Sequence, residues 1–195
     1  MKVHKGIRTG GRSARVQKAV HEAVHALLST HDRDSLTVPM VAQMSGVTPS
    51  TIYRRWGDLP SLLADVALDR MRPDEDPVDT GSLDSDLKQF AEAYLDETGS
   101  ELGTAMLRDV VASGDNGTTM RCADIARCRL AVIVERAKER GQPAPTVDQL
   151  VDGIIAPMTY RILFDRQPPT TDALFAMVDR CLLRHTTGIS EAGQG

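Results

Sequence analysis

The side chains with the clearest binding chemistry in this sequence lie in one short run, from Thr48 to the single tryptophan, Trp56. The run offers hydroxyl, phenol and guanidinium groups, on Ser50, Thr51, Tyr53, Arg54 and Arg55. Hydroxyl and guanidinium groups bind phosphate oxygens, and a guanidinium can also pair with the edge of guanine. The run is therefore suited to a polyanion, provided that one element presents these groups on one exposed face.

The residues around this run predict two short helices joined by a tight turn. Thr37 is placed to cap a helix that continues through Met44. Thr48 is placed to cap a second helix, which begins at Pro49 and ends near Trp56. The second helix is the element that would carry the polar run.

Small and apolar residues at fixed places favour a close crossing of these two helices. Ala42 is small enough for the closest approach, and Gly46 can adopt a positive φ in the turn. Val47 and Ile52 are expected to point inward, and Trp56 to close the core of the unit. The residues expected on the exposed side are Pro49, Ser50, Thr51, Tyr53, Arg54 and Arg55. This is the pattern of a helix-turn-helix, in which the second helix contacts base edges in the major groove of DNA.

The rest of the chain reads as helices separated by polar, glycine-containing or proline-containing breaks. Apolar residues recur at helical spacing from Ser13 to Leu28, and a connecting helix follows Asp58. Beyond the acidic loop 73–82, helices are expected near 83–98, 101–113, 118–140, 146–165 and 171–186. We expect an all-α chain of about nine helices, because no segment shows the two-residue alternation of a strand. It would comprise a flexible basic arm (1–12), a helix-turn-helix DNA-binding domain (13–58) and a helical carboxy-terminal domain (59–195).

Charge is unevenly distributed along the 195 residues. Residues 1–72 contain 11 Lys and Arg against six Asp and Glu, whereas residues 73–195 contain 12 against 21. The front of the chain is thus basic and the back acidic, which favours a polyanionic partner for the front. The amino-terminal arm lacks the apolar segment of a signal peptide, and no apolar run is long enough to span a bilayer. We therefore expect a cytoplasmic protein with no membrane partner.

Few residues of the sequence indicate catalysis or metal binding. The sequence has no glycine-rich phosphate loop, no GxSxG and no HExxH. His21 and His25 have a spacing that can bind a metal, but no third ligand is evident, and we interpret them as a helical surface pair. The three cysteines lack metal-site spacing and are expected to be buried or half-buried structural thiols. We expect no enzyme activity, no metal and no cofactor. A helical module that binds only proteins is the other alternative, and it would lack the steep salt dependence of a DNA-binding protein.

Two stretches of the sequence resemble a known family. The stretches LTVPMVAQMSGVTPSTIYRRW and LPSLLADV are similar to the DNA-binding region of the TetR/AcrR transcriptional regulators. The resemblance implies a homodimer that binds double-stranded DNA with one helix-turn-helix per subunit. It also implies a carboxy-terminal region that forms a small-molecule pocket and the dimer interface.

The resemblance assigns DNA contacts residue by residue. By position they fall on Thr48, Pro49, Ser50, Thr51, Tyr53 and Arg55, with Thr37 near the DNA backbone. Leu59 departs from the family, because many members have a lysine there that contacts phosphate. Arg12, Arg15 or Arg54 is expected to replace that contact.

The carboxy-terminal assignments rest on the family's pairing of the last two long helices with those of a partner subunit. The expected interface residues are Leu150, Ile154, Ile155, Met158, Ile162, Leu174, Phe175, Val178 and Leu182. The alternative is that these apolar stripes form only the core of one subunit. The expected pocket residues are Phe90, Tyr94, Met106, Leu107, Met120, Ile133, Met158, Tyr160 and Arg161. Arg161 would either bind an anionic ligand or pair with an acid such as Asp165. Pro157 is expected to kink its helix or to displace a backbone bond.

Together these features predict a bacterial transcription regulator. The simplest form is a repressor that a small molecule releases from a palindromic operator. The connecting helix, about residues 58–70, would act as the lever. An activator, or a regulator that needs no ligand, would use the same DNA-binding unit and stays open as an alternative.

Overall fold

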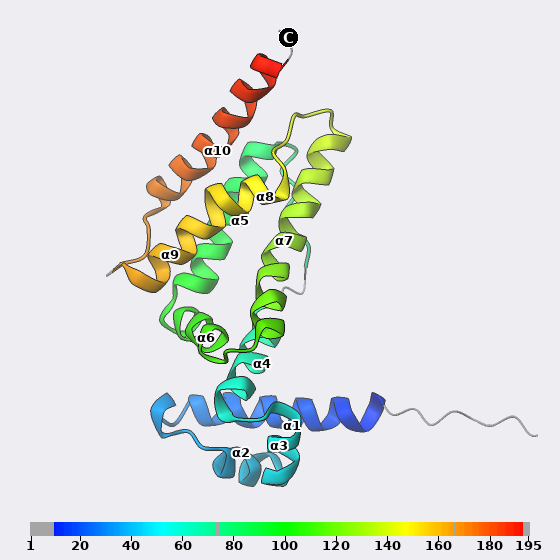
Figure 1. Cartoon of the computed structure of the whole chain (residues 1–195), viewed down its shortest axis with the longest axis vertical. Coiled ribbons are helices and arrows are strands. Elements are labelled where there is room, and N and C mark those ends of the chain that lie inside the picture. Colours follow the sequence, from blue (N-terminus) through cyan, green and yellow to red (C-terminus); the bar gives the residue numbers. More distant parts are fainter. Residues whose placement is uncertain (1–9, 73–74, 166, 193–195) are drawn as a thin grey trace, which may run out of the picture. The chain divides into compact units, whose positions relative to one another are not determined.

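The helices expected from the apolar periodicity are present in the computed structural model of the chain (Figure 1). The model describes residues 10–72, 75–165 and 167–192, without the side chains at positions 10, 12, 184 and 186–192. Its helices are α1 (Gly10–Leu28), α2 (Val38–Ser45), α3 (Pro49–Trp56), α4 (Leu59–Met71), α5 (Leu83–Gly99), α6 (Glu101–Ala112), α7 (Asn116–Glu139), α8 (Val147–Leu150), α9 (Ala156–Phe164) and α10 (Thr171–Ala192). A 3-10 turn, η1 (Arg33–Ser35), and a π-helical turn, η2 (Val151–Ile155), complete the set. Within the described residues there is no strand, and the predicted all-α class is confirmed.

Side-chain caps explain where several helices begin. Ser82 and Ser100 accept hydrogen bonds from backbone N–H groups at the starts of α5 and α6. Asp115 does the same for α7, and Thr146 forms a reciprocal capping box with Gln149 at α8. Each cap satisfies donors that the first turn of a helix leaves unpaired. The boundaries therefore lie close to the predicted ones, although α1 begins at Gly10 and η1 occupies part of the predicted polar break.

Pro157 changes the helix that contains it, as expected. In an α-helix its missing N–H would have bonded the carbonyl of Gly153. The chain widens into η2 just before the proline, where the N–H of Ala156 donates to the carbonyl of Val151. Segments α8, η2 and α9 thus form one continuous helical stretch, and counting it once gives nine helices in the described part of the chain. A Cβ at Gly153 would lie 2.9 Å from Cys181 Sγ, so only glycine allows α10 to pack this closely.

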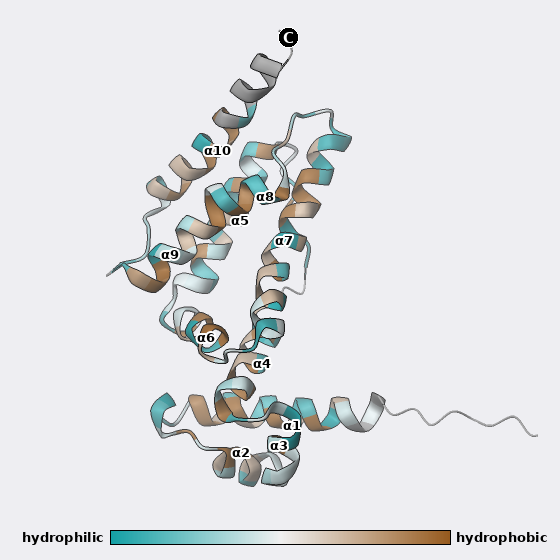
Figure 2. Cartoon of the chain, in the orientation of Figure 1, coloured by the Kyte–Doolittle hydropathy of each residue, from teal (hydrophilic) through white to brown (hydrophobic). Residues whose placement is uncertain are grey.

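The chain forms two compact units, Met1–Val66 and Ala67–Gly195, each with its own core. The first core joins α1, α2 and α3 to the beginning of α4, and Figure 2 shows the apolar residues along these helices. Its buried members are Val20, Ala23, Val24, Leu27, Leu36, Val38, Val41, Ala42, Ile52, Leu62, Leu63 and Val66. The compact unit extends beyond residue 58 because the first half of α4 completes this core. The functional assignment of the two units stays a prediction.

The second core lies among α5, α7, α10 and the α8–η2–α9 stretch (Figures 1 and 2). Helices α5 and α10 pack directly against each other, and α10 also packs on η2. The largest fully buried side chains of this unit are Leu87, Leu130, Ile133, Leu150, Ile154, Met158 and Leu174. Aliphatic residues and methionine therefore do most of the packing, as the low aromatic content requires.

Candidate nucleic-acid interface

The turn between α2 and α3 has the geometry that a helix-turn-helix requires. Gly46 ends α2 with φ 68°, in the left-handed region that favours glycine. Ala42 is buried beside the turn, Val47 is half-buried against the core, and Ile52 is almost completely buried. These contacts hold α3 by its inner face, so its other face is turned to solvent.

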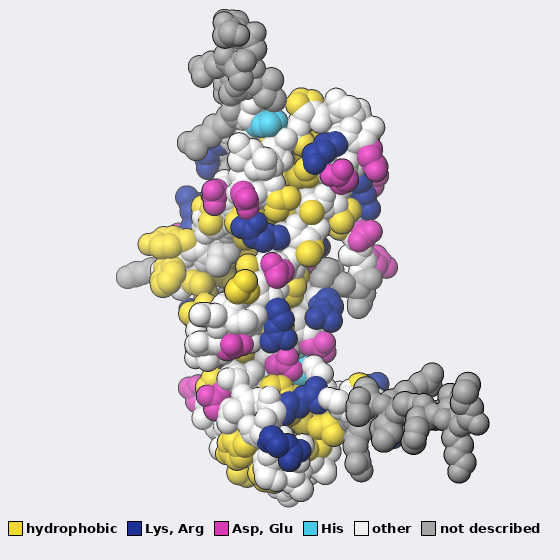
Figure 3. Space-filling view, turned by 45° about the vertical axis from the view of Figure 1, so that its right-hand side comes forward, with side chains coloured by type: hydrophobic (Ala, Val, Ile, Leu, Met, Phe, Trp, Pro, Cys, Tyr) yellow, Lys and Arg dark blue, Asp and Glu magenta, His cyan; other side chains and the backbone are white. Residues whose placement is uncertain are grey.

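Most of the predicted contact residues lie on that solvent face. Thr48, Pro49, Ser50, Tyr53, Arg54 and Arg55 are exposed, and Thr51 is half-buried. The Thr48 hydroxyl lies 2.9 Å from that of Thr51 and 3.2 Å from that of Ser50, so three hydroxyls meet at the start of α3. Figure 3 shows Lys and Arg side chains beside apolar ones on the surface of this unit. The arrangement offers hydroxyl donors and acceptors next to a positive charge.

Arg55 differs from Arg54 because its guanidinium is already bonded within the unit. One nitrogen, Nη1, donates to the backbone oxygen of Ser13 at 2.7 Å and to its hydroxyl at 3.0 Å. The other, Nη2, donates to Gln17 Oε1 at 2.7 Å. The guanidinium carbon also lies 4.9 Å from the ring centroid of Trp56. In this structure Arg55 therefore bonds α1 although its side chain is exposed, whereas Arg54 makes no hydrogen bond within the described residues.

Trp56 packs on the first core, as predicted, and also makes a hydrogen bond that the sequence did not reveal. Its indole N–H donates to Asp65 Oδ2 at 2.9 Å. The same oxygen accepts a bond from Gln17 Nε2 at 3.3 Å and lies 3.0 Å from His21 Nε2. We call Gln17, His21, Trp56 and Asp65 the Asp65 cluster. His21 is buried in it, so the predicted surface pair with His25 was wrong.

The α1 residues that bond Arg55 and Asp65 were not predicted, although their spacing in the sequence is regular. Ser13, Gln17 and His21 follow one another at intervals of four, which places them on one face of α1. A polar stripe on a helix that is otherwise packed by apolar residues indicates buried or half-buried hydrogen bonds. Asp65 could not be paired with that stripe from spacing alone, because it lies 44 residues beyond His21.

The packing at the beginning of α4 explains why position 59 holds a leucine instead of the lysine found in many family members. Leu59 packs against the first core, so an apolar residue is used there for packing. Asp58 accepts the N–H of Ser61 at 2.8 Å and caps the helix. Hydrogen bonds from the Ser61 hydroxyl and N–H hold the pKa of Asp58 below its usual value. Thr37 is exposed at the start of α2 and Arg15 is exposed on α1, whereas the Arg12 side chain lies outside the described residues.

A small cavity lies inside the second unit, between α5, α6, α7 and the last residue of α4. Its volume is about 30 Å³, and it is lined by Met71, Tyr94, Glu97, Thr98, Leu107, Cys122, Ile125, Ala126 and Arg129. Arg129 Nη1 bonds Glu97 at 3.2 Å, whereas its buried Nε has no hydrogen-bond partner among the described residues. Burial raises the pKa of the Tyr94 phenol and of the Cys122 thiol, so both groups are neutral at pH 7. The cavity wall thus offers apolar surface, neutral polar groups and one unused N–H donor.

Only Tyr94 and Leu107 of the predicted pocket residues line this cavity. Four others, Phe90, Met106, Ile133 and Met158, are buried as packing residues. Met120 and Tyr160 are exposed instead, and Arg161 is half-buried away from the cavity lining. An apolar residue at helical spacing packs in the core as readily as it lines a pocket, so the assignment of these residues to a ligand pocket stays a prediction. The sequence missed Cys122, Ile125, Ala126 and Arg129, whose spacing of three, four and seven places them on one face of α7.

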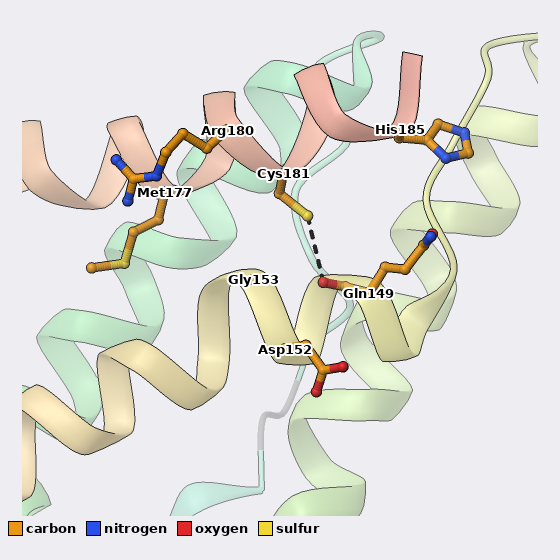
Figure 4. A pocket seen from close by; sticks show the side chains of 7 residues that line it. All are labelled: Gln149, Asp152, Gly153, Met177, Arg180, Cys181 and His185. Carbon is orange, nitrogen blue, oxygen red and sulfur yellow. Dashed lines mark hydrogen bonds between the residues drawn. The ribbon is translucent and has the colours of Figure 1, made fainter. Parts of the chain in front are cut away.

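A larger and more open groove lies between α10 and the α8–η2 segment (Figure 4). Its volume is about 410 Å³, and it is lined by Gln149, Asp152, Gly153, Met177, Arg180, Cys181 and His185. The Cys181 thiol donates to the backbone oxygen of Gln149 at 3.5 Å, which Figure 4 marks with a dashed line. None of the predicted pocket residues lies in this groove.

Most of the predicted interface residues are buried within their own subunit. Leu150, Ile154, Ile155, Met158, Ile162, Leu174 and Val178 are buried within one chain, and Phe175 and Leu182 are half-buried. The α5 and α7 side chains of the same subunit cover most of these stripes, which supports the alternative that the stripes form the core of one subunit, and the interface assignment stays a prediction. Among the described side chains of α9 and α10, the large apolar ones that remain exposed are Tyr160 (62%), Phe164 (71%) and Leu183 (64%). The rings of Tyr160 and Phe164 lie 5.1 Å apart on one face of α9.

Two further observations concern metals and membranes. Among the described residues no three His, Cys, Asp or Glu side chains form a group that could hold a metal ion. The cysteines are all free, and Cys128 is exposed rather than buried as expected. No helix in the described ranges has the length and apolar character needed to cross a bilayer.

Comparisons with known proteins agree with this architecture. A family model for the tetracyclin repressor-like C-terminal domain matches residues 77–181. The HTH-type transcriptional regulator AqdR of Rhodococcus erythropolis is 33% identical over 153 residues, covering 74% of this chain and 72% of AqdR. An uncharacterized HTH-type regulator of Mycobacterium bovis, Mb1581, is 29% identical over 167 residues, or 83% of each chain. The crystal structure of the TetR family regulator SCO0332 superposes with a TM-score of 0.64 at 26% identity, covering 87% of this chain and 96% of that one. With a helix-turn-helix unit followed by a carboxy-terminal domain of this type, the chain belongs to the TetR family of helix-turn-helix transcriptional regulators.

Proposed function

We propose that the protein is a homodimeric repressor that binds a palindromic operator and leaves it when a small molecule binds. The observation that carries the proposal is the solvent face of α3, where Ser50, Tyr53 and Arg54 are exposed while Ile52 fixes the opposite face in the core. Hydroxyls at the start of the helix contact bases or phosphates, and Tyr53 and Arg54 reach phosphates or guanine. Two such helices, one per subunit, would enter major grooves about one helical turn apart.

The dimer would form through α9 and α10. Tyr160 and Phe164 present two neighbouring aromatic rings to solvent, and Leu183 is exposed on α10. Exposed aromatic residues of this size are typical of protein–protein contacts. A two-fold arrangement of these helices would bring two helix-turn-helix units to one operator.

The effector would bind in the cavity between α5, α6 and α7. Arg129 and Glu97 are paired, so the lining carries little net charge, and the free N–H of Arg129 favours a ligand with a hydrogen-bond acceptor. A volume of about 30 Å³ holds about one water molecule, whereas ligand pockets usually measure about 300–1,000 Å³. Effector binding must therefore enlarge the cavity. Met71, at the end of α4, is part of its wall, so enlargement would displace α4 and disfavour the DNA-binding state.

The proposal is tested by selection of DNA from a pool of random duplexes with the purified protein. The selection is run at about 50 and 200 mM salt, because phosphate contacts make affinity fall steeply over this range. We expect a two-fold symmetric site whose retention drops at the higher salt. The selected site then serves as the probe in a screen for small molecules that release it.

A second arm of the selection includes cell extract as a source of effectors. If a folded, dimeric protein enriches no sequence with or without extract, it is not a sequence-specific DNA-binding protein under any of these conditions, and the proposal is wrong. Enrichment only in the presence of extract would identify a regulator that needs its ligand to bind DNA, which contradicts release by ligand.

A further inference from the structure

The two neighbouring arginines of the recognition helix α3 are both exposed but differ in their hydrogen bonds. The Arg55 guanidinium makes three hydrogen bonds to Ser13 and Gln17 on α1, at 2.7 to 3.0 Å. Arg54 is exposed and makes no hydrogen bond or ion pair to any residue within the described ranges. Adjacent residues of a helix point in different directions, so one guanidinium can reach α1 while the other cannot, although both side chains are exposed.

The bonds of Arg55 continue into the Asp65 cluster. Gln17 accepts from Arg55 through Oε1 and donates through Nε2 to Asp65 Oδ2. Asp65 belongs to α4, and the same oxygen accepts the indole N–H of Trp56 at the end of α3. Arg55 and Trp56 therefore fix the end of the recognition helix to α1 and α4 at two separate points. The second of these points, at Asp65, lies in a half-buried or buried cluster, in which His21 is 4% exposed.

We propose that Arg55 is a positioning residue that sets the orientation of the recognition helix through Gln17 and Asp65, while Arg54 contacts DNA. The inference rests on the DNA-binding function proposed above. A guanidinium is suited to this role because its planar, pre-organised donors can bond two acceptors at once. Charge-assisted hydrogen bonds of this kind are stronger than neutral ones. The positive charge next to the tryptophan thus stabilises the domain instead of neutralising a phosphate.

Substitution by lysine distinguishes the two roles. A lysine keeps the charge and can still bind a phosphate, but it cannot bond Ser13 and Gln17 in the bidentate geometry of arginine. We expect Arg55→Lys to weaken binding to the selected operator as much as Arg55→Ala does, by about tenfold. We expect Arg54→Lys to retain most of the affinity, and Arg54→Ala to lower the salt slope by about one. An Arg55→Lys variant that binds like the wild type would overturn the proposal.

A double-mutant cycle tests whether Arg55 acts through Gln17. If it does, Gln17→Ala weakens DNA binding as well, and the variant with both changes is no weaker than Arg55→Ala alone. If the fold losses of DNA affinity of the two single variants multiply in the double variant, Arg55 contacts DNA directly. Arg54→Ala combined with Gln17→Ala is the matched control, and there the losses should multiply.

The same cycle in the absence of DNA separates this inference from the proposed function. In urea unfolding of the free protein, Arg55→Ala and Gln17→Ala should each lower the urea concentration at the unfolding midpoint. The variant with both changes should have the same midpoint as the weaker of the two single variants, and Arg54→Ala should leave the midpoint unchanged. If the wild type binds no DNA but this coupling is present, the proposed function fails and the positioning contact stands. If Arg55→Ala leaves the midpoint and the amide exchange of residues 13–17 unchanged, the positioning role is wrong.

Discussion

Arg140 bonds the carboxylate of Asp86 at 2.7 Å, and the Asp86 side chain is completely removed from solvent. The backbone N–H and hydroxyl of Thr80 donate to the other carboxylate oxygen, at 2.7 and 2.6 Å. The same guanidinium reaches the exposed Asp79 at 2.6 Å. One buried carboxylate therefore ties the start of α5 and the loop before it to the residue that follows α7.

Loss of this carboxylate should be costly. Asp86→Ala leaves Arg140 and Thr80 without their buried acceptor, and removing one partner of a buried pair costs about 3–5 kcal/mol of unfolding free energy. Asp79→Ala is the matched control, because an exposed pair contributes about 0–1 kcal/mol. Urea unfolding at neutral pH measures both. Equal losses for the two variants would show that burial of Asp86 has no special role.

The contribution of Asp86 should also depend on pH. Burial alone raises its pKa, but the hydrogen bonds from Thr80 and Arg140 outweigh burial and lower the pKa below its usual value. Because the pKa is lower in the folded than in the unfolded chain, the stabilisation is complete above about pH 4 and is lost as the pH falls through the folded pKa. The difference in unfolding free energy between the wild type and Asp86→Ala should thus be constant from about pH 5 to 7 and shrink in more acidic solution. A difference that grows on acidification would contradict this assignment.

Features that depend on neighbouring residues could be predicted from the sequence, whereas contacts between distant residues could not. The turn at Gly46 and the effect of Pro157 were predictable because each depends on residues a few positions away. Thr37 and Thr48 occupy the predicted positions before α2 and α3, but their side chains make no capping hydrogen bond. The Asp65 cluster was not predictable, since it joins Gln17 to a residue 48 positions later. The burial of Met158 within its own subunit was unpredictable for a related reason, because an apolar stripe does not reveal whether the same subunit or a partner covers it.

Glycine at position 103 should be indispensable for the packing of α6 on α5. A Cβ there would clash with the backbone oxygen of Glu97 and lie 2.8 Å from Thr98 Cα, and backbone atoms cannot move aside as a flexible side chain can. We expect Gly103→Ala to destabilise the protein by about 1–3 kcal/mol or more, measured by thermal unfolding. Gly117→Ala, on α7, meets nothing closer than 3.5 Å and should be neutral or slightly stabilising. Similar behaviour of the two variants would disprove the close contact.

The proposed dimer face can be tested with two glutamate substitutions that differ only in burial. Phe164→Glu changes an exposed side chain, so the fold should persist while the dimer dissociates into monomers. Met158→Glu places a carboxylate in the core and should unfold the second unit instead. Light scattering after size-exclusion chromatography, together with circular dichroism, measures both outcomes. A Phe164→Glu protein that remains fully dimeric would place the interface away from this part of α9.

The Asp65 cluster should stabilise the first unit without affecting the second. Asp65→Ala removes the acceptor of Trp56 and of Gln17, and a hydrogen bond to a charged group contributes about 1.5–3 kcal/mol. Because Trp56 is the only tryptophan, its fluorescence reports on the first unit, whereas most of the helical circular dichroism comes from the second. In urea we expect Asp65→Ala to shift the fluorescence transition to lower concentration and to leave the main dichroism transition in place. Asp86→Ala should do the reverse, because its partners all lie in the second unit. If both probes shift together in both variants, the two units unfold as one, and the separate cores do not confer separate stability.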